Sequence, residues 1–314
     1  MTRQKGIPAM LDLFTRQSRY SDPGPYAALL DGLPADPVEL SAVVRNVLVH
    51  YRASGLSFVP GRLAEIDGRW LDRILAADQS RNPGPLTVPR APEDRVAGCC
   101  RDFTLLMVAA LRHQGVPARS RVGLASYLMP GWNCDHVVAE YWDGERWVLL
   151  DAQLEPAADR PFDPADVPRG LGPGEEWRFM TAARAWTAFR AGELDADTCG
   201  VDPSLPMSGE WFLRDQVVHE LAHRRGDELL LWDAWGMTGP DMPGGPEPID
   251  EVAALLLAAE AGDTAAEPEL ARRYSADAGL RPGRQVICLS PTGRHADIDL
   301  DRRTSTPRPP SPAP

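Results

Sequence analysis

The pattern of apolar and polar residues predicts amphipathic helices around one central apolar helix. From Leu40 to Tyr51, apolar side chains recur every three or four residues, which is the spacing of a single helix face. Asp36 and Pro37 precede this stripe and are typical of a helix N-cap and a first helical position. Residues 103–111 are apolar on every side, so we expect this helix to form the buried centre of its domain.

The other periodic segments predict strands in the middle of the chain and helices after them. Val, Tyr and Trp are concentrated at 119–127 and 136–151, as is typical of strands. Helical spacing is found in four further segments, which are 63–77, 176–192, 208–225 and 249–261. These elements together predict an α+β domain in which the buried helix packs on an antiparallel sheet, followed by a mostly helical C-terminal region.

Breaks between these elements divide the chain into five expected segments. They are an N-terminal arm (1–35), a core (36–155), a linker (156–175), a helical C-terminal region (176–290) and a disordered tail (291–314). The linker is rich in Pro, Gly and Asp. The tail prediction depends on its last residues, 301–314, which contain five prolines and no core-forming side chain.

Composition narrows the class of protein. The chain has 45 acidic and 33 basic residues, a formal charge of −12, which disfavours binding to a phosphate backbone. It lacks the run of apolar residues that a membrane-spanning helix needs and the layout of a signal peptide, so we expect a cytoplasmic protein with no nucleic-acid or membrane partner. Its five irregularly spaced cysteines predict neither a disulfide framework nor a thiolate zinc site.

The segment that opens the buried helix carries the candidate chemistry. Cys99 and Cys100 precede the apolar run, and a cysteine in the first turn of a helix lies at the positive end of the helix dipole. That position lowers the pKa of a thiol and favours the nucleophilic thiolate, and the free N–H groups can hold an oxyanion. Alternatively, a cysteine here is simply a small buried core side chain. Whether a base and an acid lie nearby distinguishes the two interpretations.

A predicted hairpin supplies those partners. Asp143 and Gly144 lie between two strand-like runs and favour a two-residue turn. In that register His136 lies directly opposite Asp151, with both side chains on one face of the sheet. A four-residue loop leaves the two diagonal on the same face. A carboxylate beside an imidazole fixes its tautomer and stabilises its protonated form. The segment therefore contains the three groups of a thiol enzyme: a cysteine thiol, His136 as a base, and Asp151 as an acid.

At this point the sequence resembles the transglutaminase-like superfamily of papain-like thiol enzymes, and in particular its bacterial members. The resemblance implies a papain-like fold with Cys100 as nucleophile, His136 as base and Asp151 as the acid that orients the base. It implies a peptidase, amidase or transamidase that acts on amide or ester bonds through an acyl-thioester, without a cofactor or metal. The substrate is then a peptide, a protein or a small amide or ester. The resemblance depends on four matching pieces: Gly98-x-Cys100-x-Asp102-Phe103, Leu111-Arg112-x-x-Gly115-Val116-Pro117-Ala118-Arg119, Asp135 to Glu140, and Trp147 to Asp151.

The sequence does not assign one role to two further side chains, Cys99 and Gln79. Cys99 is either a core residue or a redox partner of Cys100, because successive helix residues point about 100° apart and both cannot occupy one site. An upstream polar side chain such as Gln79 is a candidate for the second oxyanion donor.

A competing motif lies in the C-terminal region. His219-Glu220-Leu221-Ala222-His223 has the H-E-x-x-H spacing with which a helix can present two zinc ligands and a general base. The alternative functions are therefore a zinc metallopeptidase using this motif, with a third ligand from Glu247, Asp250 or Glu251, and a non-catalytic transglutaminase-like interaction scaffold. The plain alternative for the motif is an amphipathic helix.

Overall fold

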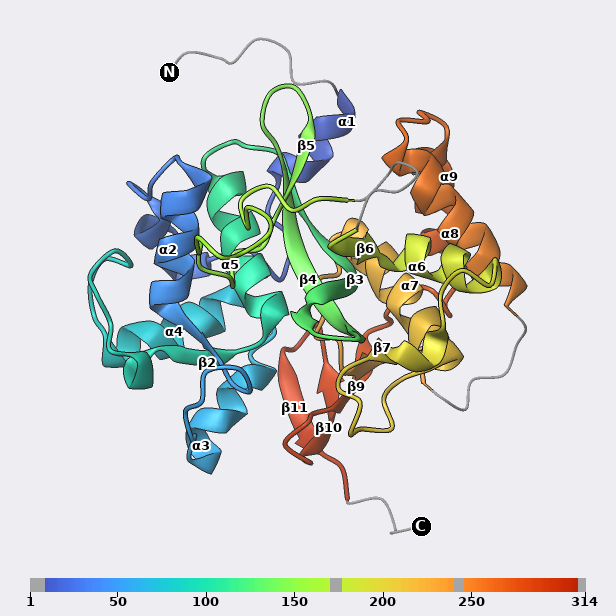
Figure 1. Ribbon diagram of the computed structural model, residues 1–314. Helices are drawn as coiled ribbons and strands as arrows, with labels where there is room; N and C mark the ends of the chain where they lie inside the picture. The colour runs from blue at the N-terminus through green and yellow to red at the C-terminus, as the bar shows by residue number, and fades with distance from the viewer. Residues whose placement is uncertain (1–8, 170–176, 240–245, 310–314) are drawn as a thin grey trace. The chain divides into compact units, whose positions relative to one another are not determined.

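The computed structural model describes residues 9–169, 177–239 and 246–309. The chain forms two compact units that interleave in sequence. The first unit extends to Arg121 and also contains Val137–Pro168, while the second contains Val122–His136 and the chain from Arg169 onward. Strands β3 (Ala118–Met129) and β4 (Trp132–Trp142) contribute residues to both (Figure 1).

The first unit contains the helices of the N-terminal half. They are α1 (Ala9–Asp12), α2 (Pro37–Val47), α3 (Pro60–Leu63), α4 (Leu71–Arg81) and α5 (Cys100–His113). The predicted N-cap of α2 is confirmed, because the Asp36 carboxylate accepts hydrogen bonds of 3.0 Å from the N–H groups of Val38 and Glu39. The helix predicted at 63–77 instead forms two pieces, since the chain turns at Gly68 before α4 begins.

Helix α5 is the buried centre of this unit, as its apolar sequence predicts. All side chains from Arg101 to Arg112 are buried, including the long aliphatic run Leu105–Leu111. The helix ends before Gly115, whose φ of +79° is the left-handed conformation that glycine adopts without strain. This burial fixes the position of the helix start, where the two cysteines lie.

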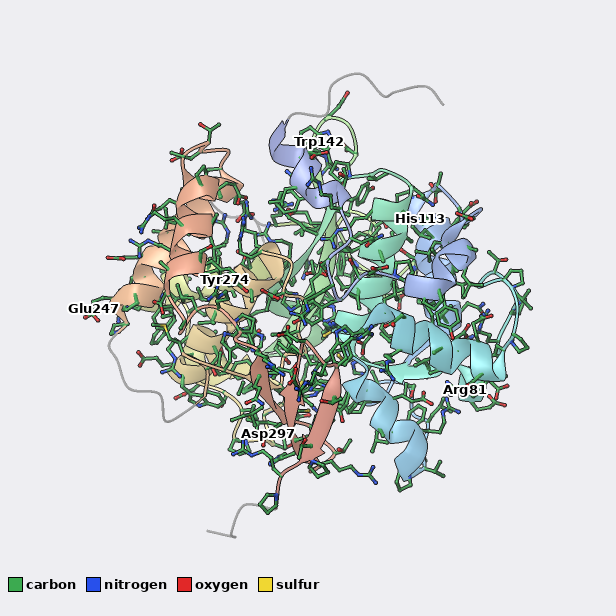
Figure 2. The ribbon with its side chains drawn as sticks, turned by 180° about the vertical axis from the view of Figure 1, so that it is seen from behind. Arg81, His113, Trp142, Glu247, Tyr274 and Asp297 are labelled. Carbon is green, nitrogen blue, oxygen red and sulfur yellow. The ribbon has the colours of Figure 1, made fainter. Side chains whose placement is uncertain are left out.

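The N-terminal segment packs against α5. The amide of Gln17 donates a 2.8 Å hydrogen bond to the carbonyl of Ala109, and Arg112 donates a 3.0 Å bond to the hydroxyl of Ser21. At the end of the helix, His113, labelled in Figure 2, lies 2.8 Å from the carboxylate of Asp31. Residues 9–35 therefore belong to the first unit, which begins earlier than the predicted core at 36.

An antiparallel sheet follows α5 in the sequence. Its strand order is β5-β4-β3-β6, with β5 at Trp147–Leu150 and β6 at Phe179–Thr181, and the short β7 (Cys199–Gly200) pairs with β4 in parallel. A buried helix and a largely antiparallel sheet give the α+β architecture expected from the sequence.

The register of the β4–β5 hairpin corrects the preferred prediction. Trp142 pairs with Trp147, so four residues rather than two form the loop. The carboxylate of Asp143 accepts hydrogen bonds from the N–H groups of Glu145 and Arg146 at 2.7 and 2.8 Å, and these bonds stabilise the wider turn. His136 is therefore not directly opposite Asp151.

In its described residues, the second unit combines four α-helices with a small sheet. The helices are α6 (Ala182–Arg190), α7 (Glu210–Arg224), α8 (Glu247–Glu260) and α9 (Ala266–Ala276). Helix α9 anchors to the loop after α7, because the Tyr274 hydroxyl donates a 2.6 Å hydrogen bond to Asp227 (Figure 2). The second sheet has the order β11-β10-β9-β8, with strands β8 (Asp233–Ala234), β9 (Gln285–Leu289), β10 (His295–Asp299) and β11 (Thr304–Pro307).

The prediction of a disordered tail from 291 is wrong over its described part. Strand β10 pairs with β9 and β11, and its Ala296 and Ile298 are buried while Asp297 between them is exposed. This short alternation is the strand signal that the proline count obscured. Residues 310–314 of the predicted tail lie outside the described residues.

The boundaries predicted around the linker also change. Residues up to Pro168 stay with the first unit, where Val167 donates a 2.9 Å backbone hydrogen bond to Leu149 of β5. Residues 170–176 of the predicted linker lie outside the described residues. In the described part of the chain, no helix is long and apolar enough to cross a membrane.

Candidate active site

Two short parallel strands carry the chain to the start of α5. Strand β1 (Leu48–His50) pairs with β2 (Val96–Gly98), and the N–H of Tyr51 donates a 3.0 Å bond to the carbonyl of Gly98. Glu65 also accepts a 3.0 Å hydrogen bond from the N–H of Ala97. The strand that leads into the cysteine pair is thus bonded at both Ala97 and Gly98, which fixes the position of the helix start.

The N-cap of α5 explains the Gly98-x-Cys100-x-Asp102 spacing. Cys99 is the N-cap, and the Asp102 carboxylate accepts a 2.9 Å hydrogen bond from its N–H. A Cβ at position 98 would lie 2.9 Å from an Asp102 oxygen and 3.1 Å from its Cβ. Only glycine leaves room for this cap, which makes Cys100 the first residue of the helix.

The charge of Asp102 is balanced by its neighbour. Arg101 is buried and donates a 3.0 Å hydrogen bond to the second carboxylate oxygen of Asp102. Burial raises the pKa of Asp102 above its ordinary value, and Arg101 opposes that rise. Arg101 also donates to the backbone carbonyl of Arg69, so the ion pair is tied to the turn before α4.

The two cysteines have different environments. Cys99 is buried with 4% of its surface exposed, whereas Cys100 is partly exposed. A hydrogen bond with the Cys100 side chain, and then burial, raise the pKa of the Cys99 thiol well above its ordinary value. Cys99 therefore stays protonated near neutral pH, which leaves Cys100 as the better candidate for the nucleophilic thiolate.

A hydrogen bond that the sequence did not predict ties α5 to β4. Thr104 lies one turn after Cys100, and its hydroxyl donates a 2.8 Å bond to the carbonyl of Val137. Val137 directly follows His136 in β4. The bond therefore holds the first turns of the cysteine helix to the strand position next to the candidate base.

His136 and Asp151 are both buried, with 1% and 2% of their surfaces exposed. The ring of His136 contacts Tyr127 of the neighbouring strand edge to face, with centroids 6.1 Å apart. Asp151 follows β5 immediately, and its N–H donates a 2.8 Å bond to the carbonyl of Pro164. Its carboxylate accepts a 3.0 Å bond from the N–H of Gln153, so its own loop orients it.

The observed register ends one residue before Asp151. Its last pair is Ala139 with Leu150, and the N–H of Asp151 bonds to Pro164 instead. Continued by one step, this register would set Asp151 opposite Val138, diagonal to His136, which is the arrangement expected for a four-residue loop.

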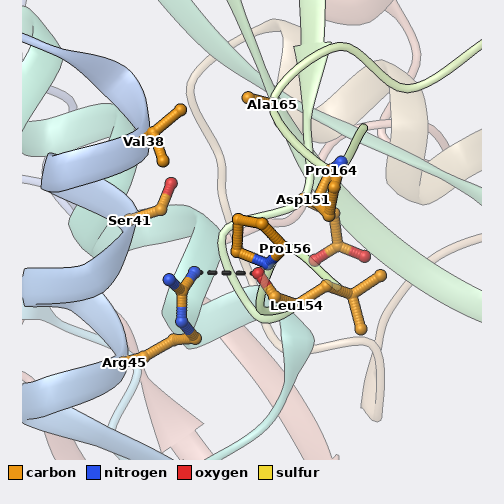
Figure 3. A pocket seen from close by; sticks show the side chains of 8 residues that line it. All are labelled: Val38, Ser41, Arg45, Asp151, Leu154, Pro156, Pro164 and Ala165. Atoms are coloured by element: carbon orange, nitrogen blue, oxygen red, sulfur yellow. Dashed lines mark hydrogen bonds between the residues drawn. The ribbon is translucent and has the colours of Figure 1, made fainter. Parts of the chain in front are cut away.

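A small hollow of about 180 Å³, including space open to solvent, lies beside Asp151 in the first unit (Figure 3). It is lined by Val38, Ser41 and Arg45 of α2 and by residues of the segment after β5. Arg45 reaches across it and donates hydrogen bonds to the carbonyls of Leu154 and Ala152 at 2.9 and 3.2 Å. No sequence pattern indicates these contacts, because an arginine in the last turn of an amphipathic helix can have many partners.

Gln79 does not fit the suggested role of oxyanion donor. Its amide nitrogen donates to the carboxylate of Asp78 and to the carbonyls of Asn82 and Gly84, and its amide oxygen accepts from the N–H of Gly84. The side chain therefore closes the loop that follows α4.

The competing His-Glu motif lies on α7, as predicted, but its side chains have structural contacts. One Glu220 oxygen accepts a 2.7 Å hydrogen bond from the N–H of Ala183 in the first turn of α6. His223 Nε2 lies 3.0 Å from the carbonyl of Leu229, so this nitrogen carries the proton. Within the described ranges, no three His, Cys, Asp or Glu side chains cluster as a metal site requires.

His219 of this motif is held in an apolar environment. It is buried against Trp235, with ring centroids 4.8 Å apart, and Nδ1 has no hydrogen-bond partner. Burial lowers the pKa of His219 to about 3. Two of the three third ligands suggested for zinc are engaged elsewhere, since Asp250 accepts from Trp186 and Glu251 pairs with Arg273.

Comparison with known proteins shows a match over part of the chain. Residues 69–152 match the family model of the transglutaminase-like superfamily. This segment is therefore similar to a transglutaminase-like core. The match begins at Arg69, which accepts the hydrogen bond from Arg101, and ends just after Asp151, so all three candidate catalytic residues lie inside it.

Other comparisons are weaker. No curated protein matches the chain. Among solved structures, a proposed cysteine protease from Cytophaga hutchinsonii is similar over 47% of this chain and 43% of its own length, at 21% identity and a TM-score of 0.32. The chain therefore spans less than half of that protein. The match over residues 69–152 supports a cysteine-dependent enzyme in general terms.

Proposed function

We propose that this transglutaminase-like protein is a thiol enzyme that cleaves or transfers acyl groups from amides or esters. Cys100 is the nucleophile, His136 is the base, and Asp151 orients His136 and stabilises its protonated form. The observation that carries the proposal is the hydrogen bond of Thr104 to Val137, which holds the capped cysteine helix to the strand position beside His136.

The reaction follows from the roles of these groups. The Cys100 thiolate attacks the carbonyl carbon and forms a carbon–sulfur bond. The carbon–nitrogen or carbon–oxygen bond to the leaving group then breaks, and His136 gives its proton to that group. The positive end of the α5 dipole favours the negative charge that develops on the carbonyl oxygen. Water or an amine next attacks the thioester, His136 takes the proton, and the thiolate is restored.

The capping arrangement supports the choice of Cys100 over Cys99. A thiolate at the first helical position is stabilised by the helix dipole. Cys99 instead provides the N-cap, is buried, and has a raised pKa. A single ionised thiol at the helix start is what acyl transfer through a thioester needs.

An activated ester tests the proposal directly. Mixing the protein with p-nitrophenyl acetate is expected to release a rapid burst of p-nitrophenol, because the first turnover acylates the enzyme. Rapid acid quench and peptide mapping should then locate the acetyl group on Cys100. Cys100→Ala should show no burst, while Cys288→Ala, which changes a buried cysteine in β9, serves as the control. The absence of a burst in the unchanged protein supports the non-catalytic scaffold instead.

The fate of the acyl group separates hydrolysis from transfer. Steady-state p-nitrophenol release is measured with increasing concentrations of a primary amine such as glycine methyl ester. A transamidase is expected to turn over faster with the amine and to yield the acetylated amine, whereas a hydrolase yields acetate at an unchanged rate. The two outcomes assign the acceptor within the same thiol mechanism.

A further inference from the structure

The anchoring of the segment that carries Asp151 suggests another residue of the same site. We propose that Arg45 is a positioning residue for the thiol reaction, because its guanidinium holds the backbone after β5 and so fixes the carboxylate of Asp151. This inference rests on the proposed function of Cys100, His136 and Asp151.

The contacts of Arg45 converge on one short segment. A single nitrogen, Nη1, donates to the carbonyls of Ala152 and Leu154, which are the first and third residues after Asp151. Figure 3 shows the bond to Leu154. The segment is also closed from within, since the N–H of Leu154 donates a 3.3 Å bond to the carbonyl of Asp151. Arg45 thus binds the residues on both sides of Gln153, whose N–H bonds to the Asp151 carboxylate.

The charges around this turn also support a role for Arg45 in positioning Asp151. Burial lowers the pKa of the Arg45 guanidinium, while the carboxylates of Glu155 and Asp151 raise it. These effects place Arg45 within electrostatic reach of Asp151, so its positive charge favours the ionised carboxylate. Only an ionised carboxylate can stabilise the imidazolium that accompanies a thiolate.

Helix α2 holds Arg45 in a fixed position. It belongs to the last turn of α2, whose first turn is capped by Asp36 and whose inner face is buried. Ser41, one turn earlier, lines the same hollow and donates its hydroxyl back to Pro37 in its own helix. Arg45 is therefore the one cationic side chain among the residues lining this hollow.

Alkylation of Cys100 by iodoacetamide tests the role without a known substrate. At pH 6 the thiolate depends on its imidazolium partner, so Arg45→Met is expected to slow labelling at least about tenfold. At pH 9.5 the thiol ionises without help, and the two proteins should react within about twofold of each other. Arg45→Lys should restore most of the rate, because one ammonium can make the contacts that Nη1 makes.

A matched control separates positioning from general damage. Gln114, just after the end of α5, also donates to two backbone carbonyls, those of Leu33 and Pro34, so Gln114→Met removes a similar pair of contacts elsewhere in the first unit. It is expected to leave the pH dependence of labelling unchanged. If Arg45→Met does not fold, Arg45→Gln, which keeps an N–H donor without the charge, replaces it in the same comparison and should also be slowed at pH 6.

The outcomes distinguish this inference from the function on which it rests. If Cys100 of the unchanged protein is no more reactive at pH 6 than a free thiol, the proposed function fails. If Cys100 is reactive but Arg45→Met labels at the same rate, the positioning role is wrong. Equal slowing at both pH values, or no recovery in Arg45→Lys, also overturns it, since those results indicate a structural role only.

Discussion

The hydroxyl of Thr104 in α5 donates a 2.8 Å hydrogen bond to the backbone carbonyl of Val137 in β4. This bond connects the helix that begins at Cys100 with the strand that contains His136. A nucleophile and its base must stay within hydrogen-bond distance during the reaction. A hydrogen bond between the helix and the strand that carry them therefore helps to keep the two groups in position.

Removing this tie should affect the thiol more than the fold. Thr104→Val keeps the side-chain shape and deletes the hydroxyl, so the free energy of unfolding is expected to fall by only about 1 kcal/mol. Labelling of Cys100 at pH 6 should slow several-fold, as measured by iodoacetamide kinetics. Thr187→Val is the control, because its hydroxyl donates to Ala183 within its own helix in the second unit. Equal labelling in both variants contradicts the role of Thr104.

Asp102 should be among the most costly side chains to remove. Asp102→Ala deletes the cap on Cys99 and the carboxylate partner of the buried Arg101. Breaking a buried charge pair from one side typically costs about 3 kcal/mol or more. Urea unfolding measures the loss, and Asp36→Ala, at the exposed cap of α2, is the comparison with an expected cost of about 1 kcal/mol. A cost for Asp102→Ala no larger than that of Asp36→Ala would falsify this account of the helix start.

The cysteine pair offers a test of which thiol reacts. Cys99→Ala should leave labelling at pH 6 intact and lower the free energy of unfolding by about 1 kcal/mol, because Cys99 is a buried N-cap. Cys100→Ala should abolish the labelling. Mass spectrometry of the alkylated peptide provides the measurement, and the opposite pattern means that the nucleophile is Cys99.

His219 should make the stability of the protein depend on pH. Its pKa is lowered to about 3 in the folded state, so between pH 6.5 and 3 the unfolded chain binds a proton that the folded protein does not. Stability is therefore lost as the pH falls, by about 3 kcal/mol between pH 7 and 4 for this group alone. His219→Leu should remove that part of the dependence, as measured by urea unfolding at both pH values.

Asp215 provides a control of opposite sign. Burial raises its pKa to about 6, so between its ordinary value and pH 6 the folded protein holds the extra proton. Its contribution to stability is lost as the pH rises through that range. Asp215→Asn should therefore steepen the fall in stability toward acid pH, whereas His219→Leu flattens it. An unchanged pH dependence in His219→Leu means that the imidazole is not held in the neutral form by burial.

Local patterns in the sequence predicted the elements that carry the candidate site. The apolar run behind Cys100 predicted a fully buried helix, and Asp36 predicted the start of α2, because both depend on neighbouring residues. The family resemblance from the same residues agrees with the match over 69–152. Motif spacing predicted Gly98 and Asp102, but their steric and capping contacts became clear only in the structure.

Features that depend on distant contacts were missed. Asp-Gly at 143 favours a tight turn, but the Asp143 side chain stabilises a wider one and changes the register. Strand β10 is too short to stand out from the prolines after it, and it is stable because β9 and β11 pair with it. Arg45 and Thr104 bond to backbone carbonyls, which every residue has, so no sequence pattern indicates their partners.

The most direct test of the thiol mechanism is the pH dependence of Cys100 alkylation in the unchanged protein, His136→Ala and Asp151→Asn. A thiolate stabilised by an imidazolium should react rapidly with iodoacetamide at pH 6, where an ordinary thiol with a pKa of about 8.5 is almost fully protonated. Both variants should lose this reactivity at pH 6 and regain it above pH 9, with the larger loss in His136→Ala. Reactivity at pH 6 that survives His136→Ala would contradict the proposed pairing of Cys100 with His136.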